Sequence, residues 1–306
     1  MIYDVVIVGA GPAAYTASIY ASRYKLKNLV IGKEPGGQIN EAHLIENYPG
    51  FSSITGAELM VKFKEHVEKF KPDLVLSEVR SIKKNNDTTL TLTDESGNKY
   101  TSKTVILATG MTYRKLRIPG EEEFIGKGVS FCFVCDGMFF KDKTVAVIGG
   151  GDSAAMGASY LASVGKKVYL IFRKDKLTAE PFWEDKIKES KNIELVPNTN
   201  IKEIRGEQLV KEVLLDTPYN GKSFIEVQGV FIEVGSLPSL ALAKELGVKA
   251  DEGGYIKINE DQSTNVEGVF AAGDITNGSN NFRQVVVASA EGSVAAGAVF
   301  KFLQKK

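Results

Sequence analysis

The amino-acid sequence predicts an α/β protein in which a second domain is inserted into the first. Short apolar, β-branched runs alternate with helical stretches along the 306 residues, and such alternation is typical of doubly wound sheets. One strand–glycine–helix arrangement opens the chain, and another begins at residue 144. Two similar apolar strands, 104–110 and 268–274, flank the second arrangement. We therefore expect the first domain to comprise residues 1–113 and 245–306, and the second to comprise residues 114–244.

Composition excludes several classes of function. The chain carries 38 basic and 38 acidic residues, so no basic field marks a nucleic-acid or membrane partner. No run of about 18 apolar residues indicates a membrane span. The segment Met1–Asp4 has no basic residues ahead of its apolar run, which argues against a signal peptide. We expect a cytoplasmic protein.

The first arrangement is typical of a dinucleotide site. The buried strand 5–8 leads into the glycine turn 9–14, and a helix follows. Gly9 permits the tight turn, Gly11 lets the backbone approach a pyrophosphate, and Ala14 keeps the helix close to the strand. The exposed amides at the start of the helix would then receive the phosphates.

The same order of elements recurs later in the chain. A strand at 144–148 leads into the second glycine turn, 149–154, and a helix of small residues runs to Val164. Gly165 is typical of a helix stop, and the segment 167–172 predicts the next strand. The sequence therefore predicts two Rossmann-like domains of the three-layer ββα type. They imply either two bound nucleotides or one fold duplicated with one site lost.

The two cysteines of the chain are Cys132 and Cys135. This spacing allows one thiolate to attack a disulfide while the other resolves the mixed disulfide. Two small buried apolar residues are the alternative reading. A zinc site needs about four ligands, and only His43 and His66 remain to join the sulfurs, so we expect no metal. A nicotinamide, a flavin and this disulfide would make an electron path.

Taken together, these residues resemble a low-molecular-weight thioredoxin reductase over essentially the whole chain. The specific feature is that the cysteine pair lies just ahead of the second glycine turn. The matching motifs are Gly9–Ala14, Gly36-Gly37-Gln38, Glu46–Phe51, Ala108-Thr109-Gly110, Cys132–Asp136, Gly149–Ala154, Gly268–Asp274 and Arg283-Gln284.

The resemblance implies FAD in the outer domain and a nicotinamide cofactor, NADPH, in the inserted one. It implies that Gln38 and Asn47 face the flavin side, that Asp274 holds the ribityl chain, and that the Arg283-Gln284 backbone lies beside the isoalloxazine. The FAD-binding set is then Gly9, Gly11, Pro12, Ala13, Ala14, Glu34, Gly36, Gly37, Gln38, Asn47, Ala108, Thr109, Gly110, Gly273, Asp274, Arg283, Gln284 and Val285. The nicotinamide-cofactor set is Gly149, Gly151, Asp152, Ser153, Arg173 and Lys174.

The resemblance also assigns roles to the redox pair. It implies that Cys135 interacts with the flavin, that Cys132 attacks the substrate disulfide, and that Asp136 supplies a proton to a departing thiolate, which requires a carboxyl partly shielded from water. It further implies a homodimer, a thioredoxin-like protein as the substrate, and rotation of the inserted domain about hinges near 114–115 and 243–244.

Two positions depart from the family pattern. Members specific for NADPH carry a His-Arg-Arg run after the second strand of the inserted domain and a further Arg four positions on, whereas this chain has Phe172-Arg173-Lys174 and Thr178. NADPH is the favoured donor, and NADH, reduced ferredoxin or reduced flavin are the alternatives. Phe133 and Val134 are more apolar than is usual between the cysteines, so they would either bury the disulfide or face a partner.

Three other functions compete with this reading. A reductase of a peroxiredoxin-type partner would use the same dithiol. A non-catalytic, redox-sensing flavoprotein would retain FAD without turnover. A zinc-binding interaction module would need a dimer to supply enough ligands.

Overall fold

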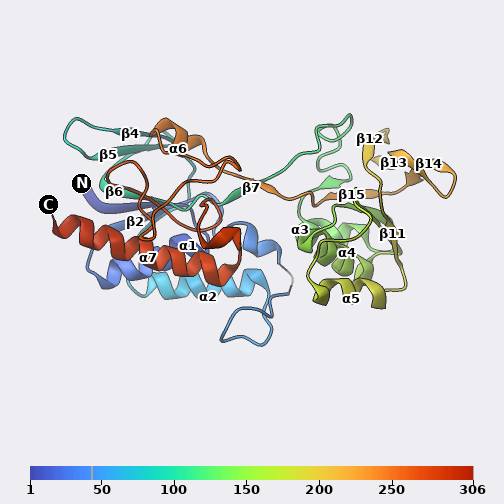
Figure 1. Ribbon diagram of the computed structural model, residues 1–306, viewed down its shortest axis with the longest axis horizontal. Coiled ribbons are helices and arrows are strands. Elements are labelled where there is room, and N and C mark those ends of the chain that lie inside the picture. The colour runs from blue at the N-terminus through green and yellow to red at the C-terminus, as the bar shows by residue number, and fades with distance from the viewer. Residues whose placement is uncertain (43, 306) are drawn as a thin grey trace. The chain divides into compact units, whose positions relative to one another are not determined.

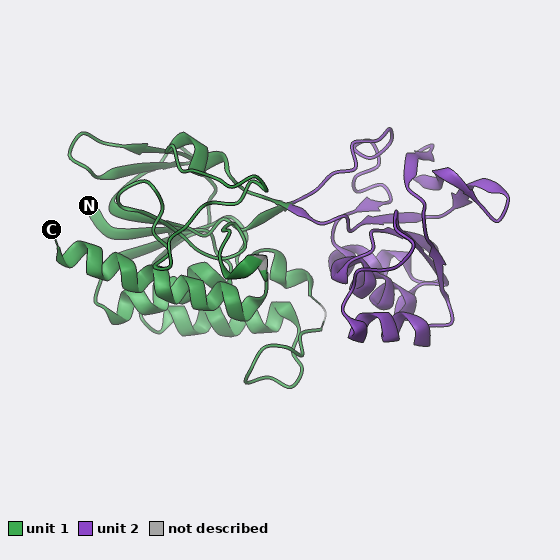
Figure 2. Cartoon of the chain, viewed as in Figure 1, with its two compact units in different colours: residues 1–112, 237–306 green, residues 113–236 purple. Residues whose placement is uncertain are grey.

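The computed structural model describes residues 1–42 and 44–305 and divides into two compact units (Figures 1 and 2). Unit 1 comprises residues 1–112 and 237–306, and unit 2 comprises residues 113–236. The second crossing therefore precedes the 244/245 boundary expected from the sequence. Ala243 and Lys244, expected at a hinge, lie inside helix α6 (Ala241–Glu245) of unit 1. His43 lies outside the described residues.

Unit 1 is built on a seven-stranded sheet. The strand order is β3-β2-β1-β6-β5-β4, and β17 also pairs with β6. Pairing is parallel among β1, β2, β3, β6 and β17, and antiparallel from β6 through β5 to β4. The strands are β1 (Ile2–Val8), β2 (Asn28–Ile31), β3 (Asp73–Val75), β4 (Val79–Lys84), β5 (Leu90–Asp94), β6 (Lys99–Leu107) and β17 (Val269–Ala271).

The register of this sheet determines where the site forms. Val8 pairs with Leu107, and Leu107 pairs with Ala271, so the carboxyl ends of β1, β6 and β17 meet at one edge. The segments that leave these three ends are the first glycine turn and the two predicted small-residue segments around 108–110 and 272–274. In doubly wound sheets ligands bind at this edge.

The central strands are apolar because both faces of the sheet are covered. Val5 and Ile7 pack into one core cluster, and Val6 and Val8 pack into another on the opposite face. Buried parallel strands read as continuous apolar runs for this reason. Figure 1 shows the three long helices of unit 1 together on one side of the strands: α1 (Pro12–Arg23), α2 (Gly56–Glu68) and α7 (Val285–Gln304).

Helix α7 packs closely on α1. A side chain at Gly292 would overlap the Ala13 carbonyl, so glycine is needed for the two helices to approach this closely. By length and by a mean hydropathy of 1.4, α7 passes the composition test for a membrane span. A core helix of a soluble protein passes the same test, and 44% of the helix window is buried inside the protein. Burial of α7 on α1 therefore explains its apolar sequence.

Helix α2 begins at a capping box, in which Thr55 and Glu58 satisfy each other's backbone amides. His66 is exposed on this helix. A short 3₁₀ helix, η1 (Gly37–Glu41), follows β2, and another, η3 (Ser279–Asn281), precedes α7.

Unit 2 repeats the doubly wound plan on a smaller scale. Its parallel sheet has the order β11-β10-β9-β15-β8, and an antiparallel sheet, β12-β13-β14, accompanies it. The strands are β8 (Val129–Ser130), β9 (Thr144–Ile148), β10 (Lys167–Ile171), β11 (Ile193–Val196), β12 (Ile201–Gly206), β13 (Val210–Tyr219), β14 (Lys222–Glu226) and β15 (Gly229–Ile232). The helices are α3 (Phe133–Asp136), η2 (Gly137–Phe140), α4 (Asp152–Val164) and α5 (Pro181–Glu189).

Two short strands carry the chain between the units. β7 (Met111–Tyr113) pairs with β16 (Ser236–Pro238) in a two-stranded sheet. The Thr112 hydroxyl donates to the Leu237 carbonyl at 3.3 Å, and the Arg114 amide donates to the Gly235 carbonyl at 3.0 Å. The two crossings therefore run side by side.

Candidate redox and nucleotide-binding sites

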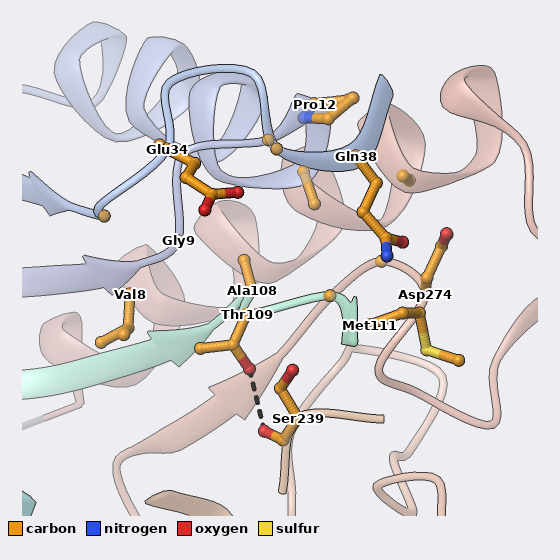
Figure 3. Close-up of a pocket in the computed structure, with 18 of the residues that line it drawn as sticks. Val8, Gly9, Pro12, Glu34, Gln38, Ala108, Thr109, Met111, Ser239 and Asp274 are labelled. Carbon is orange, nitrogen blue, oxygen red and sulfur yellow. Dashed lines mark hydrogen bonds between the residues drawn. The ribbon is translucent and has the colours of Figure 1, made fainter. Parts of the chain in front are cut away.

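A cavity of about 800 Å³ opens at the sheet edge of unit 1 (Figure 3). Most of the residues predicted to bind the first cofactor line it. These are Gly9, Gly11, Pro12, Ala13, Glu34, Gly36, Gly37, Gln38, Ala108, Thr109, Gly110, Gly273, Asp274, Arg283, Gln284 and Val285. Ala14 is buried beneath the turn, and Asn47 bonds to one of the lining residues. The structure thus brings together segments that are far apart in the sequence.

The first glycine turn is shaped to hold a phosphate group. Gly9 has φ +127°, and a Cβ there would overlap the Ala108 carbonyl, so only glycine fits. Gly11 is the N-cap of α1 and provides no side-chain cap, which leaves the first amides of a 12-residue helix available. The nearest atom to a Cβ at Gly11 is the Gly36 carbonyl oxygen, 3.8 Å away. A side chain would fill this space, so the turn fits the pyrophosphate of FAD.

The opposite wall carries polar side chains. The Asn47 Nδ2 donates to Gln284 Oε1 at 3.1 Å, so two residues predicted for the flavin side lie in contact. Burial raises the pKa of Asp274 to about 6, and Glu291 adds to this effect while the Arg283 guanidinium opposes it. The Arg283 guanidinium also stacks on the Tyr255 ring at 4.0 Å.

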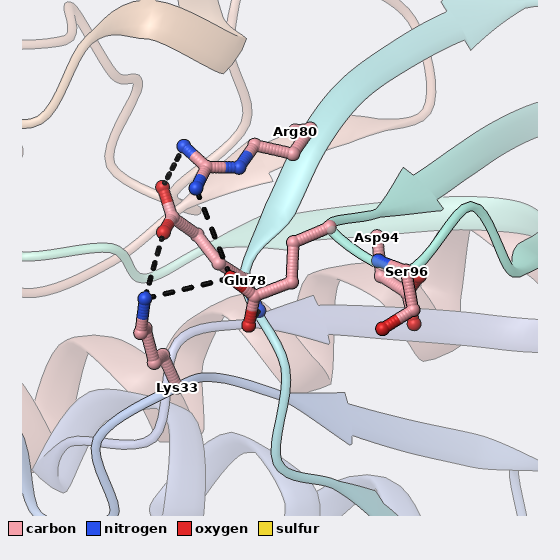
Figure 4. A network of polar contacts seen from close by, with 6 residues as sticks. Lys33, Glu78, Arg80, Asp94 and Ser96 are labelled. Atoms are coloured by element: carbon pink, nitrogen blue, oxygen red, sulfur yellow. Dashed lines mark hydrogen bonds and ion pairs between the residues drawn. The ribbon is translucent and has the colours of Figure 1, made fainter.

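Ion pairs surround the far end of the cavity. Lys33 and Glu78 line it, and Figure 4 shows them in a network with Arg80. Glu78 lies 3.5 Å from the Lys33 Nζ and 2.9 Å from Arg80, and Glu95 completes the network. These pairs are exposed, so each contributes about 0–1 kcal/mol. They connect the segment after β2 with residues at the start of β4 and just after β5.

The second glycine turn has the same geometry in unit 2. Gly149 has φ +142°, and a Cβ there would overlap the Glu233 carbonyl. Gly151 is the N-cap residue of α4 and provides no side-chain hydrogen bond to the helix. The segment after β10 folds back on this turn, because the Thr178 amide and hydroxyl both donate to the Gly150 carbonyl, at 2.7 and 3.2 Å. Asp152 accepts the Glu180 amide at 2.7 Å, whereas Ser153 is exposed.

The residues in place of the family's basic run separate into two kinds. Phe172 is buried and packs against Gly150, so its ring belongs to the core of unit 2. Arg173 and Lys174 are exposed, as is Lys176, which the sequence reasoning did not consider. None of these three cations has a side-chain ion pair within residues 1–42 and 44–305. They lie in the segment after β10, which leads to Thr178 and its contact with the second glycine turn.

Cys132 and Cys135 form a disulfide within unit 2. Cys132 is half-buried, and its Sγ accepts the Cys135 amide at 3.1 Å, whereas Cys135 is exposed. Ser130 supports the backbone, because its Oγ accepts the Cys132 amide at 3.0 Å. Asp136 follows at the end of α3 and is half-buried. No group of three or more His, Cys, Asp or Glu residues that could hold a metal occurs in the described part of the chain.

The apolar residues around the disulfide differ in their exposure. Phe133 is buried and packs against α4 near Gly157 and Tyr160, so its ring anchors α3. Met138 and Phe139, in the next turn, are 58% and 73% exposed. Sequence reasoning missed this pair. The signal available was two adjacent large apolar residues directly after the CxxC.

Comparison with known proteins identifies what this arrangement is similar to. The sequence matches the pyridine nucleotide-disulphide oxidoreductase family over residues 3–292. It is 40% identical to a thioredoxin reductase of Bacillus subtilis, with 99% of this chain and 96% of that protein covered. A crystal structure of thioredoxin reductase from Lactococcus lactis superposes with a TM-score of 0.93 at 37% identity, covering 99% of this chain and 100% of that one. A crystal structure of T. acidophilum thioredoxin reductase gives a TM-score of 0.91 at 39% identity, covering 98% of each chain.

Proposed function

The chain belongs to the pyridine nucleotide-disulphide oxidoreductase family, and on that basis we propose how its residues divide the work of reducing a thioredoxin. It is an FAD-dependent thioredoxin-disulfide reductase that uses NAD(P)H. One observation carries the assignment to residues. The disulfide and one glycine turn share unit 2, while the other glycine turn lines the large cavity of unit 1.

Unit 1 would hold FAD and unit 2 would hold the nicotinamide cofactor. When bound, FAD supplies two-electron chemistry between the nicotinamide and the protein disulfide. The start of α1 would bind the pyrophosphate, and Asn47 and Gln284 would orient the flavin side of the cavity. Asp274 would bind the ribityl chain.

The reduced dithiol would carry out the second half of the reaction. The Cys132 thiolate would attack one sulfur of the thioredoxin disulfide, forming a mixed disulfide and releasing a thiolate that Asp136 protonates. Cys135 would then attack Cys132 Sγ, which closes the Cys132–Cys135 disulfide and releases the second thioredoxin thiolate. The Cys135 amide favours this order, because a donor at Cys132 Sγ stabilises the charged thiolate form.

Replacement of each cysteine by serine tests this division. We expect Cys132→Ser and Cys135→Ser proteins to bind FAD and to have their flavin bleached by NADPH, yet to reduce no thioredoxin. Thioredoxin-coupled insulin reduction would measure the loss, and the flavin absorbance would measure retention. Wild-type turnover by either variant would contradict the dithiol mechanism.

The cations after β10 support NADPH as the donor. Arg173, Lys174 and Lys176 are exposed and carry no side-chain ion pair in the described part of the chain, so they are available to a 2'-phosphate. Anaerobic titration with NADPH and, separately, NADH compares the donors. Stoichiometric bleaching at lower concentrations of NADPH is expected. Bleaching by dithionite alone would point to reduced ferredoxin or reduced flavin.

Met138 and Phe139 would form the contact surface for thioredoxin. Exposed aromatic and methionine side chains beside a reactive centre are typical of protein interfaces. Phe139→Ala should raise the KM for thioredoxin by about tenfold, as expected for loss of an interface anchor, and leave flavin reduction by NADPH unchanged. Phe182→Ala is the matched control, since Phe182 is 43% exposed elsewhere on unit 2. Equal KM values for the two variants would contradict this surface.

The family resemblance further supports a cytoplasmic homodimer. Tyr24 and Phe300 stack at 4.6 Å between α1 and α7, beside Tyr20, which is exposed. This aromatic strip offers an apolar contact for a second copy. Light scattering during size-exclusion chromatography would measure the molar mass and so decide between monomer and dimer.

A further inference from the structure

A buried carboxylate stands behind the cofactor cavity. Glu291 lies in the middle of helix α7 and is only 5% exposed, and it is absent from the cavity lining. A buried charge in a helix is costly unless hydrogen bonds satisfy it. Among the residues the structure describes, no Lys, Arg or His forms an ion pair with Glu291. Its partners therefore explain why it is tolerated.

Within the part of the chain that the structure describes, the hydrogen-bond partners of Glu291 come from one loop. Glu291 Oε2 accepts the Gly273 amide at 2.8 Å and the Thr276 hydroxyl at 3.0 Å, and Oε1 accepts the Ser279 hydroxyl at 2.9 Å. The carboxylate thus spans the loop 273–279 from its first residue to its last. Hydrogen bonds to a charged acceptor are roughly twice as strong as neutral ones.

This loop carries Asp274 into the cavity. It begins two residues after the end of β17. Its last residue, Ser279, and the next residue, Asn280, have φ angles of +51° and +53°, which are unusual for residues other than glycine. Its other side bonds to the chain at 256–258, where the Ile256 amide donates to the Ile275 carbonyl at 2.9 Å. Glu291 is what attaches the loop to α7.

We propose that Glu291 is a positioning residue of the FAD site: its carboxylate fixes the 273–279 loop and thereby sets where the Asp274 carboxyl stands in the cavity. This inference rests on the proposed function, which places FAD there. Glutamine replaces it only in part: the amide oxygen can still accept the Gly273 amide and the Thr276 hydroxyl, but the NH₂ group no longer accepts from Ser279 and the charge is lost.

The charge of Glu291 also gives the role a measurable signature. Within the described residues, the charged groups that act on Asp274 are Arg283, which lowers its pKa, and Glu291, which raises it. Removing the Glu291 charge should therefore lower the pKa of Asp274. Any pH-dependent step in FAD release that reflects Asp274 should move to lower pH in a Glu291→Gln protein. A residue that only supports the fold would weaken FAD binding by the same factor at every pH.

The experiment measures FAD release on dilution of the holoenzyme, followed by flavin fluorescence between pH 5 and pH 8. We expect Glu291→Gln to release FAD at least about tenfold more readily, and Thr276→Val and Ser279→Ala, each of which removes one donor, to show smaller increases in the same direction. Ser293→Ala is the control on the same helix, since among the described residues the Ser293 hydroxyl bonds to the Ala290 carbonyl and to no residue of the loop. It should release FAD like the wild type.

Retention of FAD within twofold of wild type in Glu291→Gln, together with unchanged Thr276→Val and Ser279→Ala proteins, would overturn the proposal. So would a loss that is uniform across pH. Should Glu291→Gln fail to fold, the two single-donor variants still decide the matter. Failure of the proposed function is distinct, because it would appear in the wild-type protein as absence of bound FAD or of thioredoxin reduction.

Discussion

At the scale of single residues, the 3₁₀ helix η1, whose first residues line the first cavity, ends in a carboxyl whose charged form is disfavoured. Burial raises the pKa of Glu41 from its ordinary value of 4.5 to about 8, and the Glu34 charge adds to the shift. The folded protein therefore holds a proton that the unfolded chain has lost throughout the interval between these values. Stability falls as pH rises through that interval.

Glu41→Gln should remove this dependence. We expect the variant and the wild type to have similar free energies of unfolding near pH 4.5, and the variant to be the more stable by pH 8.5. The two pKa values set an upper limit of about 5 kcal/mol on the difference. Denaturant unfolding of the two proteins at pH 4.5, 6.5 and 8.5 measures it. A difference that stays constant with pH would show that Glu41 ionises normally.

At the scale of elements, the two glycine turns are equivalent in backbone geometry but serve different units. Gly9 and Gly149 have φ angles of +127° and +142°, and each faces a carbonyl of a neighbouring segment. Gly9→Ala should weaken FAD binding by about tenfold or more, because strain of about 1–3 kcal/mol arises at the turn, and should leave adenosine 2',5'-bisphosphate binding to unit 2 intact. Gly149→Ala should do the reverse. Each variant is the control for the other, and equal loss of both ligands from either would contradict separate sites.

The elements themselves were largely predictable from the sequence. The predicted strand at 144–148 and the predicted helix end at Val164 are confirmed, and the strand predicted at 167–172 is observed at Lys167–Ile171. Local sequence patterns predict these elements, because β-branched runs indicate strands and glycines mark the turns and helix ends. The cavity residues were also predictable, because the glycine-rich segments that line the cavity directly follow strand ends (Figure 3).

What could not be predicted depends on contacts between distant segments. Glu291 is 12 or more residues from its partners in the loop, and its role follows from burial. The second crossing of the chain was expected near 243–244, which instead lie inside α6, where Ala243 is buried and Lys244 is exposed. Phe133 was expected at the surface or over the disulfide, and it is buried because Gly157 on α4 leaves room for its ring. None of these facts has a local signature.

At the scale of the whole molecule, each unit has the parts of an independent domain. Unit 2 has its own core cluster, and its strands β8 and β15 lie in one sheet although they are near opposite ends of the segment. The two ends of unit 1 that flank it lie together, because the Thr112 hydroxyl donates to the Leu237 carbonyl, so a short linker can join them. Domains with separate cores and adjacent ends are typically able to fold alone.

We therefore expect residues 113–236, produced alone, to fold cooperatively, to form the Cys132–Cys135 disulfide and to contain no flavin. Unit 1, with Thr112 joined to Leu237 by a short glycine linker, should bind FAD. Mixed at micromolar concentration, the two should reduce thioredoxin at least about 10²-fold more slowly than the intact chain, because a covalent connection holds partners at millimolar effective concentration. Circular dichroism melting, flavin absorbance and insulin reduction measure these three outcomes. An unfolded 113–236 fragment would mean that unit 2 depends on unit 1 for its stability, and full activity of the mixture would mean that the two crossings are dispensable for electron transfer.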